Sequence, residues 1–318
     1  MLPNALPTAT DHVPVLADEV RELLAVQPGD TVVDATFGAG GHAALLARDL
    51  KGKGRLVAID RDPTVRPFFE GFSRRHGGLQ TRFLRGEADV VLSQLAGNGF
   101  GADAVLMDLG VSSMQIDRPE RGFSYATDAP LDMRMDPTAQ LSAADLVNET
   151  SERELASIFR RFGEERYARQ IARAIARRRR ERPFERTGEL VDTIRGALPT
   201  PVRFGDGHPA KRVFQALRIA VNDELGSLER ALPAALALLR PGGRLAVISF
   251  HSLEDRVVKR FLRDQERGCT CPPDFPVCVC GREPALRLLT RRAVRPSARE
   301  VADNPRAASA RLRAAVKA

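Results

Sequence analysis

The 318-residue sequence has no tryptophan, two tyrosines and four cysteines. All four cysteines lie within residues 269–280, which excludes a fold held together by disulfides along its length. No apolar run approaches the roughly 20 residues that a transmembrane helix needs. Residues 1–12 lack the basic and apolar segments of a signal peptide. We therefore expect a cytoplasmic protein with no membrane partner.

Basic residues outnumber acidic ones, with 49 Lys and Arg against 41 Asp and Glu, giving a formal net charge of +8. Nearly all of the basic residues are Arg, whose planar guanidinium suits phosphates and guanine edges. This balance favours a nucleic-acid partner, although a GC-rich genome would also enrich Arg. The hydrophobic content of 43% is ordinary for a globular protein.

Short apolar runs alternate with helical stretches in the first half of the chain. The runs that predict buried strands are Thr31–Asp34, Arg55–Ile59, Thr81–Leu84 and Asp103–Met107, and the helical stretches include His42–Leu50 and Thr64–Arg75. This alternation predicts a right-handed parallel α/β sheet. Ligands of such sheets bind beyond the carboxyl ends of the strands, so the residues that end or follow each strand are the functional candidates.

The strand pattern stops between residues 126 and 206, where helical spacing takes over. Ser151 and Glu154 form a capping pair before one predicted helix, and a second helix follows Gly163. The sequence therefore predicts an α/β domain made of residues 1–125 and 207–318, with an all-helical domain of residues 126–206 inserted into it.

The α/β pattern then resumes. The predicted elements are helices at Lys211–Asn222 and Glu224–Leu239, a turn at 241–243, a strand at Arg244–Phe250 and a helix at Ser252–Asp264. Ser252 and Asp255 are predicted to cap the last of these helices. The segment from Cys269 onward is rich in Arg and Pro, and we expect it to be partly irregular.

A glycine-rich turn follows the first predicted strand, between Asp34 and His42. Its glycines allow close approach of a ligand, but the spacing also fits a dinucleotide-binding loop. Asp60, directly after the second strand, can accept the ribose hydroxyls that NAD and S-adenosylmethionine share. Asp34 can supply the acid that the ammonium of S-adenosylmethionine needs. Turn formation by Asp34 and helix capping by His42 remain alternative roles.

Asp108 stands at the carboxyl end of the fourth predicted strand, where amine methyltransferases hold the acceptor nitrogen. The lone pair of an exocyclic cytosine nitrogen is delocalised, so a hydrogen-bond acceptor on its N–H helps it to attack a methyl group. The proline-containing motif of many amine methyltransferases is absent here. Phe123, close to Tyr125, is a candidate to stack on an extruded base and equally a candidate core residue.

Taken together, these segments resemble one family, the bacterial ribosomal RNA small subunit methyltransferase H (MraW) family. The matching segments run along the chain and include 12–16, 34–42, 58–62, 108–113, 121–124, 131–136, 208–210, 214–219, 249–256 and 304–306. The resemblance implies a class I, Rossmann-like, S-adenosylmethionine-dependent methyltransferase sheet interrupted by a helical substrate-recognition domain. It also implies methylation of the N4 amine of a decoding-centre cytidine in 16S ribosomal RNA, with the small ribosomal subunit as partner.

The family's site residues transfer to matching positions of this sequence. Asp108 is the implied catalytic residue. The implied contacts to S-adenosylmethionine are Gly40, Gly41, His42, Asp60, Ala88, Asp108 and Gln115. Relatives can carry an aromatic residue at the position of Ala88, and Ala308 replaces an Arg that is common in the family.

Two predicted helix faces offer contacts to RNA. Arg169, Arg173, Arg177 and Arg180 share one face, which suits either solvent or phosphates, while Lys211, Gln215, Arg218 and Asn222 share another. The candidates for contact with the substrate are Phe123, Arg218, Asn222 and His251.

The cysteines follow the pattern Cys269-x-Cys271-x6-Cys278-x-Cys280. Four thiolates could form a tetrahedral structural zinc site. The spacing is tighter than in common zinc fingers, and relatives exist without these cysteines, so the sequence assigns no metal ligand.

Two rival functions remain open at this stage, a nicotinamide-dependent reductase that uses the glycine-rich turn and a ribosome-assembly factor that binds RNA without catalysis. The sequence also leaves open the oligomeric state and whether the substrate is naked RNA or an assembled subunit.

Overall fold

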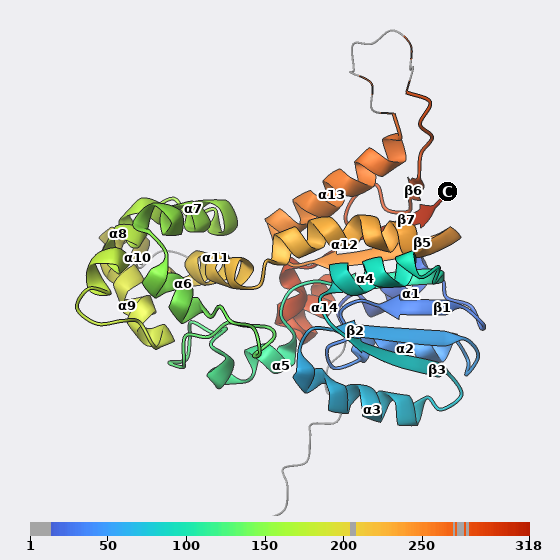
Figure 1. Ribbon diagram of the computed structural model, residues 1–318, viewed down its shortest axis with the longest axis horizontal. Helices are drawn as coiled ribbons and strands as arrows, with labels where there is room; N and C mark the ends of the chain where they lie inside the picture. The colour runs from blue at the N-terminus through green and yellow to red at the C-terminus, as the bar shows by residue number, and fades with distance from the viewer. Residues whose placement is uncertain (1–13, 204–207, 270, 272–276, 278–279) are drawn as a thin grey trace, which may run out of the picture. The chain divides into compact units, whose positions relative to one another are not determined.

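The computed structural model describes residues 14–203, 208–269, 271, 277 and 280–318 (Figure 1). Cys278 and the expected domain boundary at residues 206 and 207 lie outside these residues. The chain divides into two compact units, one made of residues 1–110 and 225–318 and the other of residues 111–224. No helix in the described part of the chain is long and apolar enough to cross a membrane.

The first unit is built on a seven-stranded sheet in the order β3-β2-β1-β4-β5-β7-β6. Its strands are β1 (Thr31–Asp34), β2 (Arg55–Asp60), β3 (Gln80–Arg85), β4 (Ala102–Asp108), β5 (Leu239–Ser249), β6 (Leu286–Leu288) and β7 (Arg311–Lys317). Strands β1 to β5 pair in parallel, as expected, whereas β7 pairs antiparallel with both β5 and β6. This order and the reversed β7 are those of a class I methyltransferase sheet, so the predicted fold class is confirmed.

Helices cover this sheet. They are α1 (Ala17–Leu24), α2 (Gly41–Asp49), α3 (Arg66–Arg75), α4 (Ala88–Gly97), α12 (Glu224–Leu238), α13 (Ser252–Arg267) and α14 (Ala298–Asp303), with 3₁₀ turns η1 (Pro63–Val65) and η3 (Pro305–Ser309). Helices α4, α12 and α13 lie along one face (Figure 1). Their apolar residues join Val33, Ile59 and Val105 of the strands in one buried cluster. Alternate strand residues such as Leu56 and Leu106 point to the opposite face and are also fully buried.

The second unit is helical. Its helices are α5 (Ser113–Ile116), α6 (Ala143–Glu149), α7 (Glu152–Gly163), α8 (Ala168–Arg178), α9 (Thr187–Ala197), α10 (Thr200–Arg203) and α11 (Lys211–Val221), with the 3₁₀ turn η2 (Pro119–Arg121). Ser151 caps α7 by accepting a hydrogen bond from the Glu154 N–H, as predicted. No strand occurs among the described residues of this unit.

The unit boundaries differ from the expected ones because α11 belongs to the helical core. Phe214 and Leu217 of α11 pack in one cluster with Phe159 of α7. Gly163 allows this close packing, since a Cβ there would lie 2.5 Å from the Arg212 carbonyl oxygen. Residues 111–125 and 208–224, which the sequence assigned to the α/β domain, thus belong to the helical unit.

Three local details differ from the predictions. Residues 241–243 lie within β5 and form no separate turn. The N-cap of α13 is His251, not Ser252, because the His251 Nδ1 accepts the Glu254 N–H and the Glu254 carboxylate accepts the His251 N–H. The last segment is partly irregular, as expected, but it also contains strand β7, which the sequence did not predict. Arg313 of this strand is buried by pairing with Asp255, at 2.6 Å from Nε to Oδ1, so the strand lacks the apolar pattern that would reveal it.

Candidate active site

Three aspartates end three neighbouring strands at one edge of the sheet. Asp34 ends β1, Asp60 ends β2 and Asp108 ends β4, and these strands lie side by side in parallel. The glycine-rich loop after β1 is tied to both neighbours. The Gly38 N–H donates to Asp60 Oδ2 at 2.8 Å, and the Thr36 Oγ1 accepts the Asp108 N–H at 2.6 Å. The loop and the carboxylates therefore form one structured site.

The glycines of this loop meet a backbone requirement. Gly38 and Gly40 have φ angles of 53° and 82°, in the left-handed region that favours glycine. A Cβ on Gly40 would also lie 2.7 Å from the ring of Phe37. Gly41 begins helix α2, whose first N–H groups have no partner within the helix. The turn thus places His42, in the first turn of α2, beside Asp108.

His42 and Asp108 form the centre of the site. His42 is 7% exposed, and its Nε2 lies 3.5 Å from Asp108 Oδ2. Neither ring nitrogen of His42 makes a hydrogen bond, and the buried Oδ1 of Asp108 also lacks one. Buried polar atoms without partners destabilise a folded protein and call for an explanation. A polar ligand bound against His42 and Asp108 would supply those partners.

The electrostatics of the site are dominated by buried acids. Burial raises the pKa of Asp34 to about 7, that of Asp60 to about 6 and that of Asp108 to about 8. The charges of Asp34 and Glu254 raise the pKa of Asp108 further. Burial also lowers the pKa of His42 to about 4, so this ring is neutral at pH 7 and offers no compensating charge. The site therefore attracts a cation and repels an anion.

Asp34 and Asp60 also have local hydrogen bonds. Asp34 Oδ1 accepts the Thr36 N–H at 3.1 Å, which is the turn role considered above. Asp60 accepts the Gly38 N–H on one oxygen and the Asp62 N–H, at 2.9 Å, on the other. Each carboxylate oxygen has a second lone pair. These hydrogen bonds orient the acids and leave them able to accept from a ligand.

Ala88 and Gln115, the other residues expected to contact the cofactor, show no feature that indicates a ligand. Ala88 begins α4, directly after β3, and its methyl group packs against the core of the sheet unit. Its side chain therefore offers no polar contact. Gln115 lies in α5 of the helical unit, where it is buried and its Oε1 accepts the Ser112 N–H at 3.0 Å. Contact of either residue with a cofactor stays a prediction.

The four substrate candidates all take part in interactions within their own units. Phe123 packs against the helical core, with the Arg121 guanidinium 5.9 Å from its ring centre. Arg218 forms a two-pronged ion pair with Glu224, with both N···O distances at 2.8 Å. His251 caps α13, and its Nε2 lies 3.2 Å from Glu254 Oε1. A role in substrate contact stays a prediction for each of them.

Asn222 shows the clearest structural role. Its Nδ2 donates to the carbonyl oxygens of Met133 and Arg218, each at 2.8 Å, and its Oδ1 accepts the Met135 N–H at 2.7 Å. The side chain thereby fixes the segment that contains Met133, which has a left-handed φ of 60°. Contact of Asn222 with substrate also stays a prediction.

Sequence reasoning missed Glu254 as part of the site. This residue is 2% exposed in the first turn of α13, and its charge acts on Asp108. The sequence feature that could have identified Glu254 is its position soon after the fifth strand, at the same end of the sheet as Asp108. Spacing instead predicted Asp255 as the capping acid of this helix, whereas Glu254 forms the capping box with His251.

Comparison with known proteins gives the family. The sequence profile of the MraW methylase family matches residues 9–318. The chain belongs to the MraW methylase family. One relative, ribosomal RNA small subunit methyltransferase H of Heliobacterium modesticaldum, is 52% identical over 310 residues, covering 96% of this chain and 98% of that protein. The protein of the same name from Symbiobacterium thermophilum is 53% identical over 316 residues, covering 97% of each.

Solved structures similar to this MraW family member are much more distant. An rRNA methylase of Streptococcus thermophilus matches with a TM-score of 0.41 at 12% identity, covering 95% of this chain and 93% of that one. TrmN of Thermus thermophilus matches with a TM-score of 0.43 at 16% identity, covering 98% of this chain and 52% of that one. Similarity at this level carries no information about the substrate.

Proposed function

We propose that this chain transfers a methyl group from S-adenosylmethionine to the N4 amine of a cytidine in the decoding centre of 16S ribosomal RNA. Membership of the MraW methylase family and the names of the relatives support methylation of small-subunit ribosomal RNA. The observation that carries the proposal is the cluster of buried acids, with partnerless polar atoms, at the ends of β1, β2 and β4.

The charge of the site favours S-adenosylmethionine over a nicotinamide dinucleotide. S-adenosylmethionine carries a sulfonium and an ammonium, and both positive charges would stabilise the ionised forms of Asp34 and Asp108. A dinucleotide would instead place its pyrophosphate, with two negative charges, above the same loop. Asp60 suits the ribose hydroxyls of either compound. The residues therefore fit S-adenosylmethionine and disfavour the reductase alternative.

Asp108 is the proposed acceptor of a hydrogen bond from the target amine. When bound, S-adenosylmethionine supplies an activated methyl group, so alignment accounts for much of the rate. The amine nitrogen would displace the sulfur of the cofactor from the methyl group, and the proton that the methylated amine then loses would pass to solvent. Ionised Asp108 would polarise the N–H and hold the nitrogen lone pair in line. His42, neutral and 3.5 Å away, would help to orient that carboxylate.

The helical unit offers a surface for RNA phosphates. Arg169, Arg173 and Arg177 are exposed and recur every fourth residue along α8. A surface hollow beside them is lined by Arg160, Arg166, Tyr167, Arg169 and Gln170. Guanidinium groups bind phosphate oxygens in pairs and release counterions on binding. We propose that this unit contacts the ribosomal RNA and acts as the substrate-recognition domain.

The test is methyl transfer to small subunits from a strain that lacks the modification. With labelled S-adenosylmethionine, we expect label in 16S ribosomal RNA and N4-methylated cytidine by mass spectrometry of its nucleosides. Asp108→Ala should lose transfer while keeping its circular dichroism spectrum. Asp303→Ala removes an exposed acid of the same unit and should keep full activity.

Several results would count against the proposal. Label on another base, or on another atom of cytidine, would refute the substrate assignment. Full activity of Asp108→Ala would refute the role of that residue. Binding of the subunit with no transfer, or thermal stabilisation by NADH alone, would favour the assembly factor or the reductase.

A further inference from the structure

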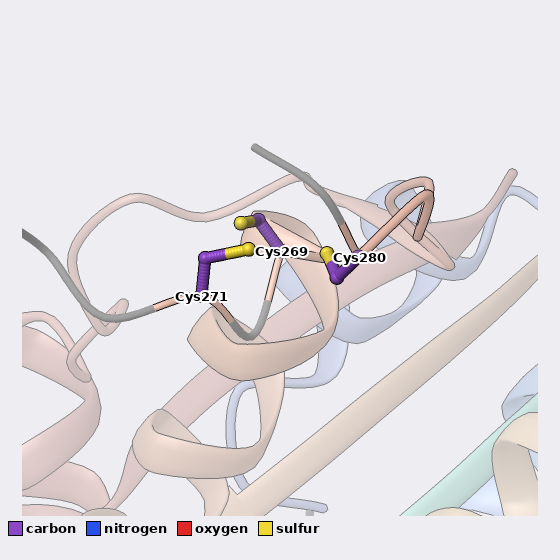
Figure 2. Close-up of side chains that lie close together, drawn as sticks. All are labelled: Cys269, Cys271 and Cys280. Carbon is purple, nitrogen blue, oxygen red and sulfur yellow. The ribbon is translucent and has the colours of Figure 1, made fainter. Parts of the chain in front are cut away.

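Three cysteine sulfurs meet in the loop between α13 and β6 (Figure 2). Cys269 and Cys271 follow the end of α13, and Cys280 lies on the returning arm of the loop. The sulfur atoms of these residues all lie within 4.8 Å of one another, and all three residues are partly buried. Cysteines from both arms of the loop therefore bring three sulfur atoms, which are soft metal ligands, close together.

One backbone and one side-chain hydrogen bond join the two arms of this loop. The Ala285 N–H donates to the Gln265 carbonyl oxygen at 3.0 Å, and the Leu288 N–H donates to Glu266 Oε1 at 3.2 Å. Gly268, at the end of α13, has a φ of 63°, and a Cβ there would lie 2.6 Å from the carbonyl carbon of Glu283. The two arms of the loop are thus held close together at the end of α13, next to the cysteines.

The geometry points to a zinc(II) site formed by Cys269, Cys271 and Cys280. In a tetrahedral site with Zn–S bonds of about 2.3 Å, neighbouring sulfurs lie about 3.8 Å apart. The observed limit of 4.8 Å is about 1 Å longer than this, a difference that small side-chain rotations can close. Thiolate sulfur is a preferred ligand of zinc, whereas magnesium and calcium prefer oxygen.

The position of the site indicates a structural role. Helix α13 begins at Ser252, beside the acid cluster, and its 16 residues end at Arg267, just before Cys269. A helix of this length spans about 24 Å at 1.5 Å per residue. The ion would lie at the end of α13 that is remote from Asp108. It would fasten the loop that joins α13 to β6 and would take no part in methyl transfer.

The test measures metal content, so its result does not depend on the proposed function. The full chain is purified without chelators, and its transition metals are measured by mass spectrometry. We expect about one zinc per chain in the unmodified protein. Cys271→Ser and Cys280→Ser should each lower that content by about tenfold, because loss of one thiolate removes a metal–sulfur bond. Val277→Ser changes an exposed residue of the same loop and should keep the zinc.

A second measurement covers the case in which the serine variants do not fold. Treating the unmodified protein with a thiol-modifying reagent should release zinc in proportion to the thiols modified. Replacing zinc with cobalt(II) should give the near-ultraviolet charge-transfer absorption of thiolate ligands. The inference fails if the unmodified protein with reduced thiols holds no zinc, if it holds iron instead, or if the triple serine variant keeps its zinc. Cysteines recovered as a disulfide from protein purified under reducing conditions would equally overturn it.

Discussion

Replacing Asp108 with Asn should make the ligand-free protein more stable at neutral pH, although it should abolish methyl transfer. The change replaces a largely buried, ionisable carboxyl group with a neutral amide of nearly the same shape. Burial and the charges of Asp34 and Glu254 raise the pKa of Asp108 from 3.8 to about 8. Ionisation of such a carboxyl at neutral pH destabilises the folded protein, and Asn cannot ionise.

The sign and size of the effect follow from proton linkage. A carboxyl with a higher pKa in the folded than in the unfolded chain binds its proton more tightly when folded. It therefore destabilises the folded protein as pH rises from 3.8 towards about 8, and it has no such effect below 3.8. Between pH 3.8 and about pH 7.5 this destabilisation accumulates to about 5 kcal/mol, at about 1.36 kcal/mol per pH unit.

The measurable gain should be smaller than this limit. The Asp108 side chain is 27% exposed, so solvent screens part of its charge. The Asn amide also buries polar hydrogens that need partners. We expect Asp108→Asn to raise the free energy of unfolding by about 1 to 3 kcal/mol at about pH 7.5, and by almost nothing near pH 4.

Urea unfolding at these two pH values, followed by circular dichroism, measures the difference. Asp303→Asn is the matched control, because its carboxylate is 76% exposed and lies 4.0 Å from Arg299. This control should change stability little at either pH. The reasoning is refuted if Asp108→Asn is less stable than the unmodified protein at neutral pH, or if its advantage is the same at both pH values.

Three further predictions concern the cofactor, the RNA and the loop. The affinity for S-adenosylmethionine should rise between about pH 5.5 and 7.5, because a bound cation favours the ionised forms of Asp34 and Asp108. Calorimetry of binding in two buffers should show proton release, and proton uptake would contradict the prediction. The double change Arg169→Ala and Arg173→Ala should weaken binding to the small subunit and reduce its salt dependence, while the affinity for S-adenosylmethionine stays the same. Filter binding at several salt concentrations measures both the affinity for the subunit and its salt dependence. Gly40→Ala should destabilise the protein by about 1 to 3 kcal/mol in thermal or urea unfolding, since its φ of 82° is unfavourable for alanine; an unchanged stability would show that the turn adapts.

The sequence predicted the parallel part of the sheet and the acids at its edge well. Strands β1, β2 and β4 are short apolar runs buried on both faces, so their composition alone reveals them, whereas β3 contains several polar residues and is only partly buried. Because parallel strands end at one edge, the positions of Asp34, Asp60 and Asp108 after separate strands were enough to bring them together. Their raised pKa values could not be predicted in this way, since they depend on burial and on Glu254, which comes from a distant segment.

Elements stabilised by polar pairs escaped prediction. Strand β7 contains Arg311 and Arg313, and both pair with Asp255 of α13. Neither periodicity nor propensity identifies a strand whose inward residues are charged. The hydrogen bonds of Arg218 and Asn222 within the chain were hidden for a similar reason, because a polar helix face looks the same in sequence whether or not it bonds to its own chain.

The same buried acids that weaken the ligand-free protein suit it to its proposed cofactor. Marginal stability, about 5 to 15 kcal/mol for a typical protein, leaves little room for carboxyls held away from water. A sheet edge selected for stability alone would replace Asp34 and Asp108 with apolar residues. Their presence, with partnerless atoms on Asp108 and His42, is explained if a positively charged ligand restores ionisation and completes the hydrogen bonds. Binding should then both stabilise the fold and convert Asp108 into the ionised acceptor that the target amine requires.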